Sequence, residues 1–336
     1  MTCFDKRFSH LYIEQAVWDH PDVQRIRELF PKAVCIPISR YTDVFNRAKQ
    51  SYETQYARQN LILAKKHGTF LYEGAPVCHD FGNRHFFYTA MAINCLYNCE
   101  YCWLKGMYNS ANLVLFVNLE DAFQETEQRL EEGPMYLSLS FESDLVPLEP
   151  FTHQITRWNA FVQEHAGLTT EIRTKCGSTA IYETLEASDR FITAFTLSPQ
   201  VLIDAMEHGT SSLAQRLDAV NAAMRNGFPV RICFDPMIRI PDWKTAYEEL
   251  IHTVADKVDL SAVKDFSIGT YRQSDTYQRR MRRRFPASAV LQYPYETKNG
   301  YCQYPEPEKT EMEQFLKHAL LQYVREEQIY LLEDNV

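Results

Sequence analysis

The pattern of hydrophobic and polar residues changes near His85. Before it, the apolar stretches are short: Pro21–Phe30 has helical periodicity, and Ala33–Ser39 is typical of a short strand. From His85 to Tyr271, apolar runs of strand length alternate with longer amphipathic segments. The expected strands are Phe86–Asn94, Leu113–Val117, Met135–Ser140, Thr170–Lys175, Phe191–Ser198, Pro229–Met237 and Phe266–Tyr271. The expected helices are Leu119–Glu132, Phe151–His165, Ser178–Leu185, Ser212–Arg225 and Asp242–Val258.

Repeating strand–helix units indicate an α/β fold with a parallel sheet and right-handed crossovers. About six such units predict an incomplete TIM-like (β/α)6 barrel, with its chemistry at the carboxyl ends of the strands. We therefore expect an N-terminal α/β layer at residues 1–84, a partial barrel at 85–272 and a C-terminal extension at 273–336.

The C-terminal extension begins with a basic segment. Tyr277–Arg284 is expected to be helical and contains Arg279, Arg280, Arg282, Arg283 and Arg284. Such a run suits phosphate contacts, although a run of charge is also typical of a solvated helix face. Asn299–Gly300 then predicts a hairpin, and Lys309–Tyr323 an amphipathic closing helix.

Composition limits the class of protein and the cellular compartment that we expect. The chain has 336 residues, of which 45% are hydrophobic, so it can bury a large core. Met1–His20 is charged throughout and does not resemble a secretory signal, and no run approaches the length of a transmembrane helix. We expect a cytoplasmic protein with reduced thiols and no membrane association. Because the net charge is −9, contact with a polyanion would require a local basic patch.

The strongest chemical signal is a loop with three cysteines, which we call the cysteine loop (residues 95–102). Cys95, Cys99 and Cys102 have the spacing Cys-x3-Cys-x2-Cys. Three thiolates can hold three irons of a cubic iron–sulfur cluster. Because no fourth cysteine follows at comparable spacing, one iron would stay open to a ligand.

Two other interpretations of the loop remain. Zinc also accepts three cysteines, and Cys78 or His79 could provide the fourth ligand, although zinc sites favour paired Cys-x2-Cys knuckles. Alternatively, the cysteines are simply buried, since cysteine is among the most buried residue types.

The spacing, with an aromatic residue just before the last cysteine, resembles that of the radical S-adenosylmethionine (SAM) superfamily. The resemblance implies a [4Fe–4S] cluster whose open iron binds the amino and carboxylate groups of SAM. It also implies reductive cleavage to methionine and a 5′-deoxyadenosyl radical, with an electron donor such as flavodoxin or ferredoxin.

Nearly the whole chain resembles the spore photoproduct lyase family, whose members reverse a UV-induced thymine dimer in DNA. The similar segments are Phe116–Glu120, Ser143–Val146, Thr152–His153, Thr174–Lys175, His208–Leu217 and Gly227–Pro229. The resemblance implies radical SAM chemistry, with DNA as the partner.

The resemblance also implies roles for individual residues. Cys95, Cys99 and Cys102 would bind the cluster, and Tyr101, Ser143, Lys175 and Thr196 would contact SAM. Tyr101 would also take part in hydrogen transfer. Independently of the resemblance, the basic run and the hairpin suggest that Arg279, Arg280, Arg283, Arg284 and Tyr301 would contact nucleic acid. On residue chemistry alone, Ser143 could instead be a helix N-cap and Lys175 could form a strand-end salt bridge.

The chain departs from the family at the positions that complete repair. The lyases have a cysteine, which returns a hydrogen atom to thymine, where this chain has Phe141. Trp103 replaces a tyrosine, and the wedging hairpin is reduced to Glu296–Tyr301. Cys176 is the best candidate for a replacement donor, because it follows Lys175 at a strand end; its alternative is a small buried thiol.

Three hypotheses follow. The first is a lyase-like radical SAM enzyme acting on thymine dimers in DNA. The second is an enzyme of the same superfamily that abstracts hydrogen from a different substrate. The third is a non-catalytic, metal-containing DNA-binding protein.

Overall fold

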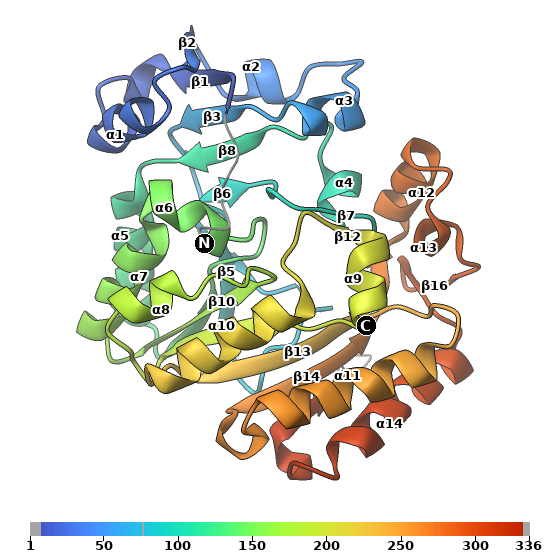
Figure 1. The fold of residues 1–336 in the computed structure, drawn as a ribbon. Helices are drawn as coiled ribbons and strands as arrows, with labels where there is room; N and C mark the ends of the chain where they lie inside the picture. The colour runs from blue at the N-terminus through green and yellow to red at the C-terminus, as the bar shows by residue number, and fades with distance from the viewer. Residues whose placement is uncertain (1–7, 76, 332–336) are drawn as a thin grey trace. The chain divides into compact units, whose positions relative to one another are not determined.

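The computed structural model describes residues 8–75 and 77–331 and divides the chain into two compact units (Figure 1). Unit 1 takes in the chain up to Gly74 and residues 83–96 and 107–173. Unit 2 takes in residues 75–82, residues 97–106 and the chain from Thr174 onward. Each unit therefore combines separate stretches of chain. Unit 1 extends across the boundary expected after residue 84, and unit 2 extends across the one expected after residue 272.

Unit 1 contains two sheets. Four parallel strands and one antiparallel edge strand form the first sheet, in the order β2 (Val34–Ile38), β1 (His10–Glu14), β3 (Leu61–Ala64), β8 (Leu113–Phe116) and β6 (Ala92–Ile93). In the second sheet, β10 (Leu168–Thr174), β9 (Met135–Ser138) and β5 (Phe86–Thr89) are parallel, and β4 (Leu71–Glu73) is antiparallel to β5. Every residue of β3, β8 and β9 is buried, as expected for strands covered on both faces.

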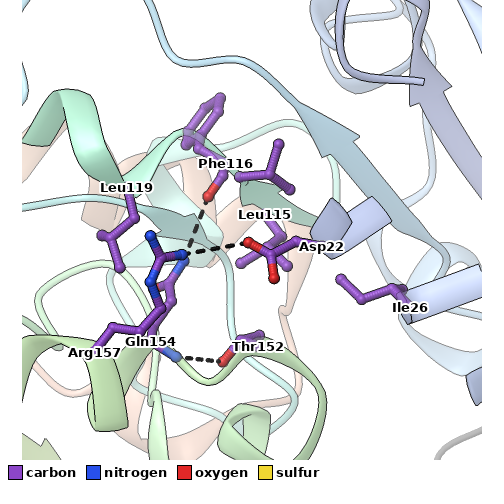
Figure 2. A pocket seen from close by; sticks show the side chains of 9 residues that line it. Asp22, Ile26, Leu115, Phe116, Leu119, Thr152, Gln154 and Arg157 are labelled. Atoms are coloured by element: carbon purple, nitrogen blue, oxygen red, sulfur yellow. Dashed lines mark hydrogen bonds and ion pairs between the residues drawn. The ribbon is translucent and has the colours of Figure 1, made fainter. Parts of the chain in front are cut away.

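The helices of unit 1 are α1 (Pro21–Leu29), α2 (Thr42–Phe45), α3 (Tyr52–Ala57), α5 (Leu119–Leu130), α6 (Glu149–Thr152) and α7 (Gln154–Glu164). Figure 2 shows a small pocket lined by residues of α1, β8 and α7. An ion pair of 3.3 Å between Arg157 and Asp22 lies at this pocket, and Gln154 donates to the carbonyl of Phe116. The ion pair at the pocket connects α1 to α7. None of the predicted site residues lines the pocket.

Unit 2 is organised around parallel strands in the order β18 (Ile329–Leu331), β14 (Asp265–Thr270), β13 (Val230–Met237) and β11 (Phe191–Thr196). The helices between them are α9 (Gln200–Met206), α10 (Leu213–Arg225) and α11 (Trp243–Lys257); α8 (Ala180–Thr184) precedes β11 and α14 (Glu306–Leu320) precedes β18. Ser212 and Gln215 form a capping box that begins α10, close to the predicted start of this helix.

The C-terminal extension contains β15 (Arg272–Ser274), α12 (Asp275–Arg284), α13 (Ala289–Gln292), β16 (Glu296–Lys298) and β17 (Tyr301–Gln303). The hairpin between β16 and β17 turns at Asn299 and Gly300, whose φ angles are +48° and +84°. Two consecutive positive φ angles favour an Asn–Gly pair, so the hairpin prediction is confirmed.

The α/β class and the alternating parallel strands are confirmed, but two predicted elements are wrong in detail. Phe86–Asn94 is two strands, β5 and β6, which belong to different sheets of unit 1. Phe151–His165 is interrupted at His153, whose φ of +53° places it in the left-handed region between α6 and α7. Within the described part of the chain, no helix has both the length and the apolar character needed to cross a membrane.

Candidate active site

The cysteine loop follows β6 and passes from unit 1 into unit 2. Cys95 belongs to unit 1, where its carbonyl accepts a hydrogen bond of 3.1 Å from Gln59. Cys99 ends the short strand β7 (Asn98–Cys99), and Cys102 immediately precedes the turn that leads into α4 (Leu104–Met107). The Cys102 amide donates to the Cys99 carbonyl at 3.2 Å, so these two cysteines are held within one tight turn.

A second short strand holds this turn in place. β12 (Glu207–His208) pairs antiparallel with β7, and Glu207 lies opposite Cys99 (Figure 1). The amide of Glu100 extends the pairing by donating to the Met206 carbonyl at 2.8 Å. The pairing brings an acidic side chain from the end of α9 to the cysteine loop, which no local sequence pattern predicted.

Glu207 is fully buried and is the centre of a charged network in unit 2. Its carboxylate accepts hydrogen bonds from Tyr101, Arg216 and Ser198, the last at 2.9 Å. Lys175 forms an ion pair with it at 3.1 Å. Burial alone would raise the pKa of Glu207, but the Lys175 and Arg216 cations outweigh burial and hold that pKa at about 2.

Arg216 is also fully buried. Its guanidinium donates to the carbonyls of Thr196 and Ser211, at 2.9 and 3.0 Å, in addition to Glu207. The planar fork therefore fixes the carboxyl end of β11 and the loop before α10 to the same carboxylate. Arg216 lies in the segment that resembles the lyase family, but the sequence did not predict this role.

Lys175 follows β10 directly and points its ammonium group at the cysteine turn. Its Nζ lies 2.5 Å from the Tyr101 hydroxyl, 3.9 Å from Cys99 Sγ and 4.6 Å from the centre of the Tyr101 ring. Burial lowers the pKa of Lys175, but negative charge at Cys99 and Glu207 outweighs it and raises the pKa above its usual value. The strand-end salt bridge is therefore present, and it lies beside a cysteine of the motif.

Burial raises the pKa of Cys99 to about 11, and the neighbouring Lys175 works in the opposite direction. Burial also raises the pKa of Cys102. Two shielded thiols that share a turn, with a cation beside one of them, suit the binding of a soft metal centre, which requires thiolates. Cys99 and Cys102 therefore fit two of the thiolate ligands of an iron–sulfur cluster.

Ser143 lies in unit 1, after β9, and its side chain is almost completely buried. In the described structure, its hydroxyl oxygen has no hydrogen-bond partner. Ser143 does not cap a helix: Leu145 is the N-cap of the following turn, and Asp144 accepts the Val146 amide at 3.2 Å. The N-cap alternative is therefore wrong, and the buried hydroxyl remains available to a ligand.

Phe141 and Glu142 precede Ser143 in unit 1. The ring of Phe141 stacks on Tyr88, with centroids 3.9 Å apart and planes inclined by 21°. Glu142 accepts a hydrogen bond from Tyr108, and burial raises the pKa of this carboxyl above its usual value. The position at which the resemblance implies a hydrogen-donor cysteine is therefore part of an aromatic stack here.

Cys176 and Thr196 lie at strand ends in unit 2. Cys176 follows Lys175, is completely buried, and donates its backbone amide to Thr174 Oγ1 at 2.9 Å. Thr196 is the last residue of β11 and is also buried. A role for Cys176 as hydrogen donor and a role for Thr196 in SAM binding stay predictions.

The arginine run forms α12, as predicted, and its members point in different directions. Arg279 and Arg283 are exposed, and Arg279 forms an ion pair with Asp275 on the same helix. Arg280 and Arg284 donate to backbone carbonyls, and so does Arg282, which bonds Leu291 and Tyr293. Tyr301 lies in β17, opposite Ser274 and Lys298.

In the described structure, neither the cysteine loop nor His79 belongs to a ligand set for a single metal ion. Within residues 8–75 and 77–331, no three His, Cys, Asp or Glu side chains are gathered as a single metal ion requires. His79 instead lies 2.7 Å from the Leu331 carbonyl and stacks on Phe81, with ring centroids 4.8 Å apart.

Comparison with known sequences finds similarity to spore photoproduct lyases. The chain is similar to the spore photoproduct lyase of Geobacillus sp., with 24% identity over 217 residues that cover 60% of each chain. It is also similar to that of Bacillus subtilis, with 22% identity over 273 residues that cover 76% of this chain and 74% of the relative. The match thus spans only about 60% of the Geobacillus relative.

Solved structures show the same fold over nearly the full length. A spore photoproduct lyase mutant superposes with a TM-score of 0.84 at 18% identity, covering 98% of this chain and 99% of that one. A lyase complexed with dinucleoside spore photoproduct gives 0.82 at 18% identity, with 97% and 98% covered. A mutant with bound AdoMet and dinucleoside spore photoproduct gives 0.80 at 18% identity, with 98% and 99% covered.

These likenesses confirm the predicted partial-barrel fold. A sequence model described as spore photoproduct lyase matches residues 10–332, nearly the whole chain. The chain therefore belongs to the spore photoproduct lyase family.

Proposed function

We propose that the chain is a radical SAM enzyme in which Cys95, Cys99 and Cys102 hold a [4Fe–4S] cluster. The observation that carries the proposal is the position of Lys175, whose ammonium group lies 3.9 Å from Cys99 Sγ and contacts Tyr101 and Glu207. A cation beside a cluster ligand can pair with the carboxylate of SAM. When bound, the cluster supplies the electron that cleaves SAM reductively.

Other residues of the chain would hold SAM in place. The buried Ser143 hydroxyl, which has no partner in the described structure, suits a polar group of the ligand. Thr196 lies at the carboxyl end of β11, where ligands bind in folds of this kind. Glu207 would orient the side chains of Lys175 and Tyr101 through an ion pair and a hydrogen bond, and Arg216 would hold Glu207 in place.

Anaerobic reconstitution with iron, sulfide and SAM, followed by dithionite, tests the proposal. Formation of 5′-deoxyadenosine would support it, whereas a protein that takes up zinc and no iron would overturn it. In the cell, an electron donor such as flavodoxin or ferredoxin would replace dithionite, and we propose a cytoplasmic setting.

We further propose that the substrate is a thymine-dimer photoproduct in DNA. The support is membership of the lyase family, together with a similar solved lyase that holds dinucleoside spore photoproduct. The exposed Arg279 and Arg283 and the hairpin residue Tyr301 would contact the nucleic acid. The test is an assay of photoproduct cleavage that compares UV-damaged oligonucleotides with other candidate substrates.

One observation favours a second function, hydrogen abstraction from a substrate other than this lesion. Phe141 has no S–H bond to donate, and its ring is stacked on Tyr88. A chain that repaired thymine would need another hydrogen donor, for which Cys176 is our candidate. The same reconstituted protein can be assayed for SAM cleavage in the absence of damaged DNA.

Replacing Lys175 with alanine is expected to weaken SAM binding about tenfold or more. A hydrogen bond to a charged group is worth roughly 1.5–3 kcal/mol, and the variant lacks the ammonium group beside Cys99. SAM affinity would be measured by equilibrium dialysis of the reconstituted protein, with the exposed Lys257→Ala as control. Equal affinity in the two variants would refute the assignment, and iron content should stay unchanged in both.

Replacing Phe141 with cysteine is expected to convert an incomplete or adduct-forming reaction on damaged DNA into clean thymine formation. The change restores an S–H bond at the position where the lyases have one. Products would be separated by chromatography after reaction of a defined photoproduct oligonucleotide.

Cys176→Ala provides the matching test of the alternative donor. It should leave SAM cleavage intact and produce adducts in place of thymine; clean repair by this variant would eliminate Cys176. If neither the parent nor Phe141→Cys repairs the lesion, the second function is favoured.

A further inference from the structure

Four of the five arginines of α12 form two pairs, and the members of each pair are four residues apart. Arg279 and Arg283 are exposed, whereas Arg280 and Arg284 are partly buried. Residues four apart lie on the same helix face, so α12 presents one pair outward and the other inward. All four arginines were expected to contact nucleic acid, and the structure separates them.

The inward pair binds the chain that follows Cys102. Arg280 donates to the carbonyl of Gly106 at 2.7 Å, and Arg284 to the carbonyl of Lys105 at 2.6 Å. Both carbonyls belong to α4, a helix too short to satisfy its last carbonyls internally. The two guanidinium groups therefore supply the missing donors and favourable charge at its carboxyl end.

Further contacts extend this attachment along residues 97–106. Ser288, just after α12, donates to the carboxylate of Glu100, which lies between Cys99 and Cys102. The Lys105 ammonium lies 5.0 Å from the centre of the Phe285 ring, and it also donates to the Asn98 carbonyl at 3.2 Å. In Figure 1, α12 and α13 lie beside β7 and β12.

Gly106 explains how α12 can approach so closely. A Cβ atom added at Gly106 would lie 2.4 Å from the Cβ of Tyr277 and 2.8 Å from its Cα. Any side chain there would push α12 away from α4, and the two arginine–carbonyl hydrogen bonds would lengthen. The close packing and the hydrogen bonds therefore depend on each other.

We propose that Arg280, Arg284 and Ser288 are positioning residues, which hold residues 97–106 and thereby set the placement of Cys99 and Cys102. The outward pair, Arg279 and Arg283, then provides the phosphate contacts of this helix. The inference rests on the proposed function for the identity of the bound group and for DNA as the polyanion; the attachment of the loop to α12 is a property of the chain itself. One face of α12 thus holds the segment that contains the cysteine turn, and the other face contacts the polyanion.

Two double variants with the same loss of charge test the proposal. Arg280→Gln with Arg284→Gln should release cluster iron to a chelator at least about tenfold faster than the parent. It should also change the electron paramagnetic resonance spectrum of the reduced cluster, because the ligating thiolates are held less firmly. The matched control, Arg279→Gln with Arg283→Gln, should leave both unchanged.

The same two variants separate the DNA role. The outward variant should flatten the salt dependence of DNA binding by about 0.9 in slope for each lost phosphate contact. The inward variant should retain the parental slope. Equal slopes in the two variants, or equal iron release, would overturn the division of roles.

A third measurement decides the proposal even if the protein holds no cluster. Hydrogen–deuterium exchange of residues 97–106 in the protein as isolated should be faster in the inward variant only. Arg280→Lys with Arg284→Lys, which keeps a cationic donor at each position, should restore slow exchange and, where a cluster is present, slow iron release. Unchanged exchange in the Gln variant would refute the positioning role, whereas faster exchange without a cluster would refute the proposed function alone.

Discussion

Replacing Cys99 with alanine is expected to abolish reductive cleavage of SAM. Each of the three motif cysteines would supply one iron with its thiolate, and Cys99 is the one beside Lys175. The variant should also hold substantially less iron after anaerobic reconstitution. Iron content, visible absorption and 5′-deoxyadenosine formation are the measurements.

Cys233→Ala is the matched control for the loss of a buried thiol. Cys233 lies in β13, is completely buried, and lies outside the cysteine loop. The control should bind iron and cleave SAM like the parent. Parental cleavage by the Cys99→Ala protein would remove Cys99 from the cluster, and equal iron loss in both variants would indicate a general effect on folding.

Replacing Glu207 with glutamine is expected to cause the largest loss of stability. The change leaves the buried Arg216 and the partly buried Lys175 without their shared counter-ion, and breaking a buried ion pair on one side costs about 3–5 kcal/mol. The midpoint of urea denaturation, measured on the protein without cofactors, should fall accordingly. Glu311→Gln removes an exposed carboxylate that pairs with Lys244 and should have little effect; similar midpoints for the two variants would contradict the role of Glu207.

The same residue gives a pH dependence with a definite sign. The folded-state pKa of Glu207 is about 2, below the usual value of 4.5 for a glutamate. Its contribution to stability is therefore complete above about pH 4.5 and is lost as the pH falls towards 2. The parent should show this loss, and the Glu207→Gln protein should lack this component of it.

Local patterns predicted most of the fold correctly. The β8 segment is a continuous apolar run, as β9 is up to Ser138, α10 begins close to its predicted start at Ser212, and Asn299–Gly300 forms the expected turn. Each of these signals acts within a few residues. The five-stranded sheet of unit 1 was not predicted, because its N-terminal strands join the rest of the sheet through the pairing of β3 with β8, which follows β3 by many residues.

The candidate site shows the same limit. The motif and the resemblance indicated Lys175, Tyr101 and Cys99, and the structure brings these three together. Glu207 was missed, because its importance arises from the pairing of β12 with β7, two strands of only two residues each. The two faces of α12 could have been recognised from the four-residue spacing of its arginines, but not what the inward face touches.

The stacking of Phe141 on Tyr88 affects how the protein is damaged by oxygen. A partly exposed thiol at this position could be converted by oxygen to sulfenic and then sulfinic acid, a change that thiols alone cannot reverse. A phenyl ring does not undergo this series of oxidations. Damage by peroxide or oxygen would therefore spare position 141, and aerobic inactivation would be traced to the cysteine loop or to Cys176.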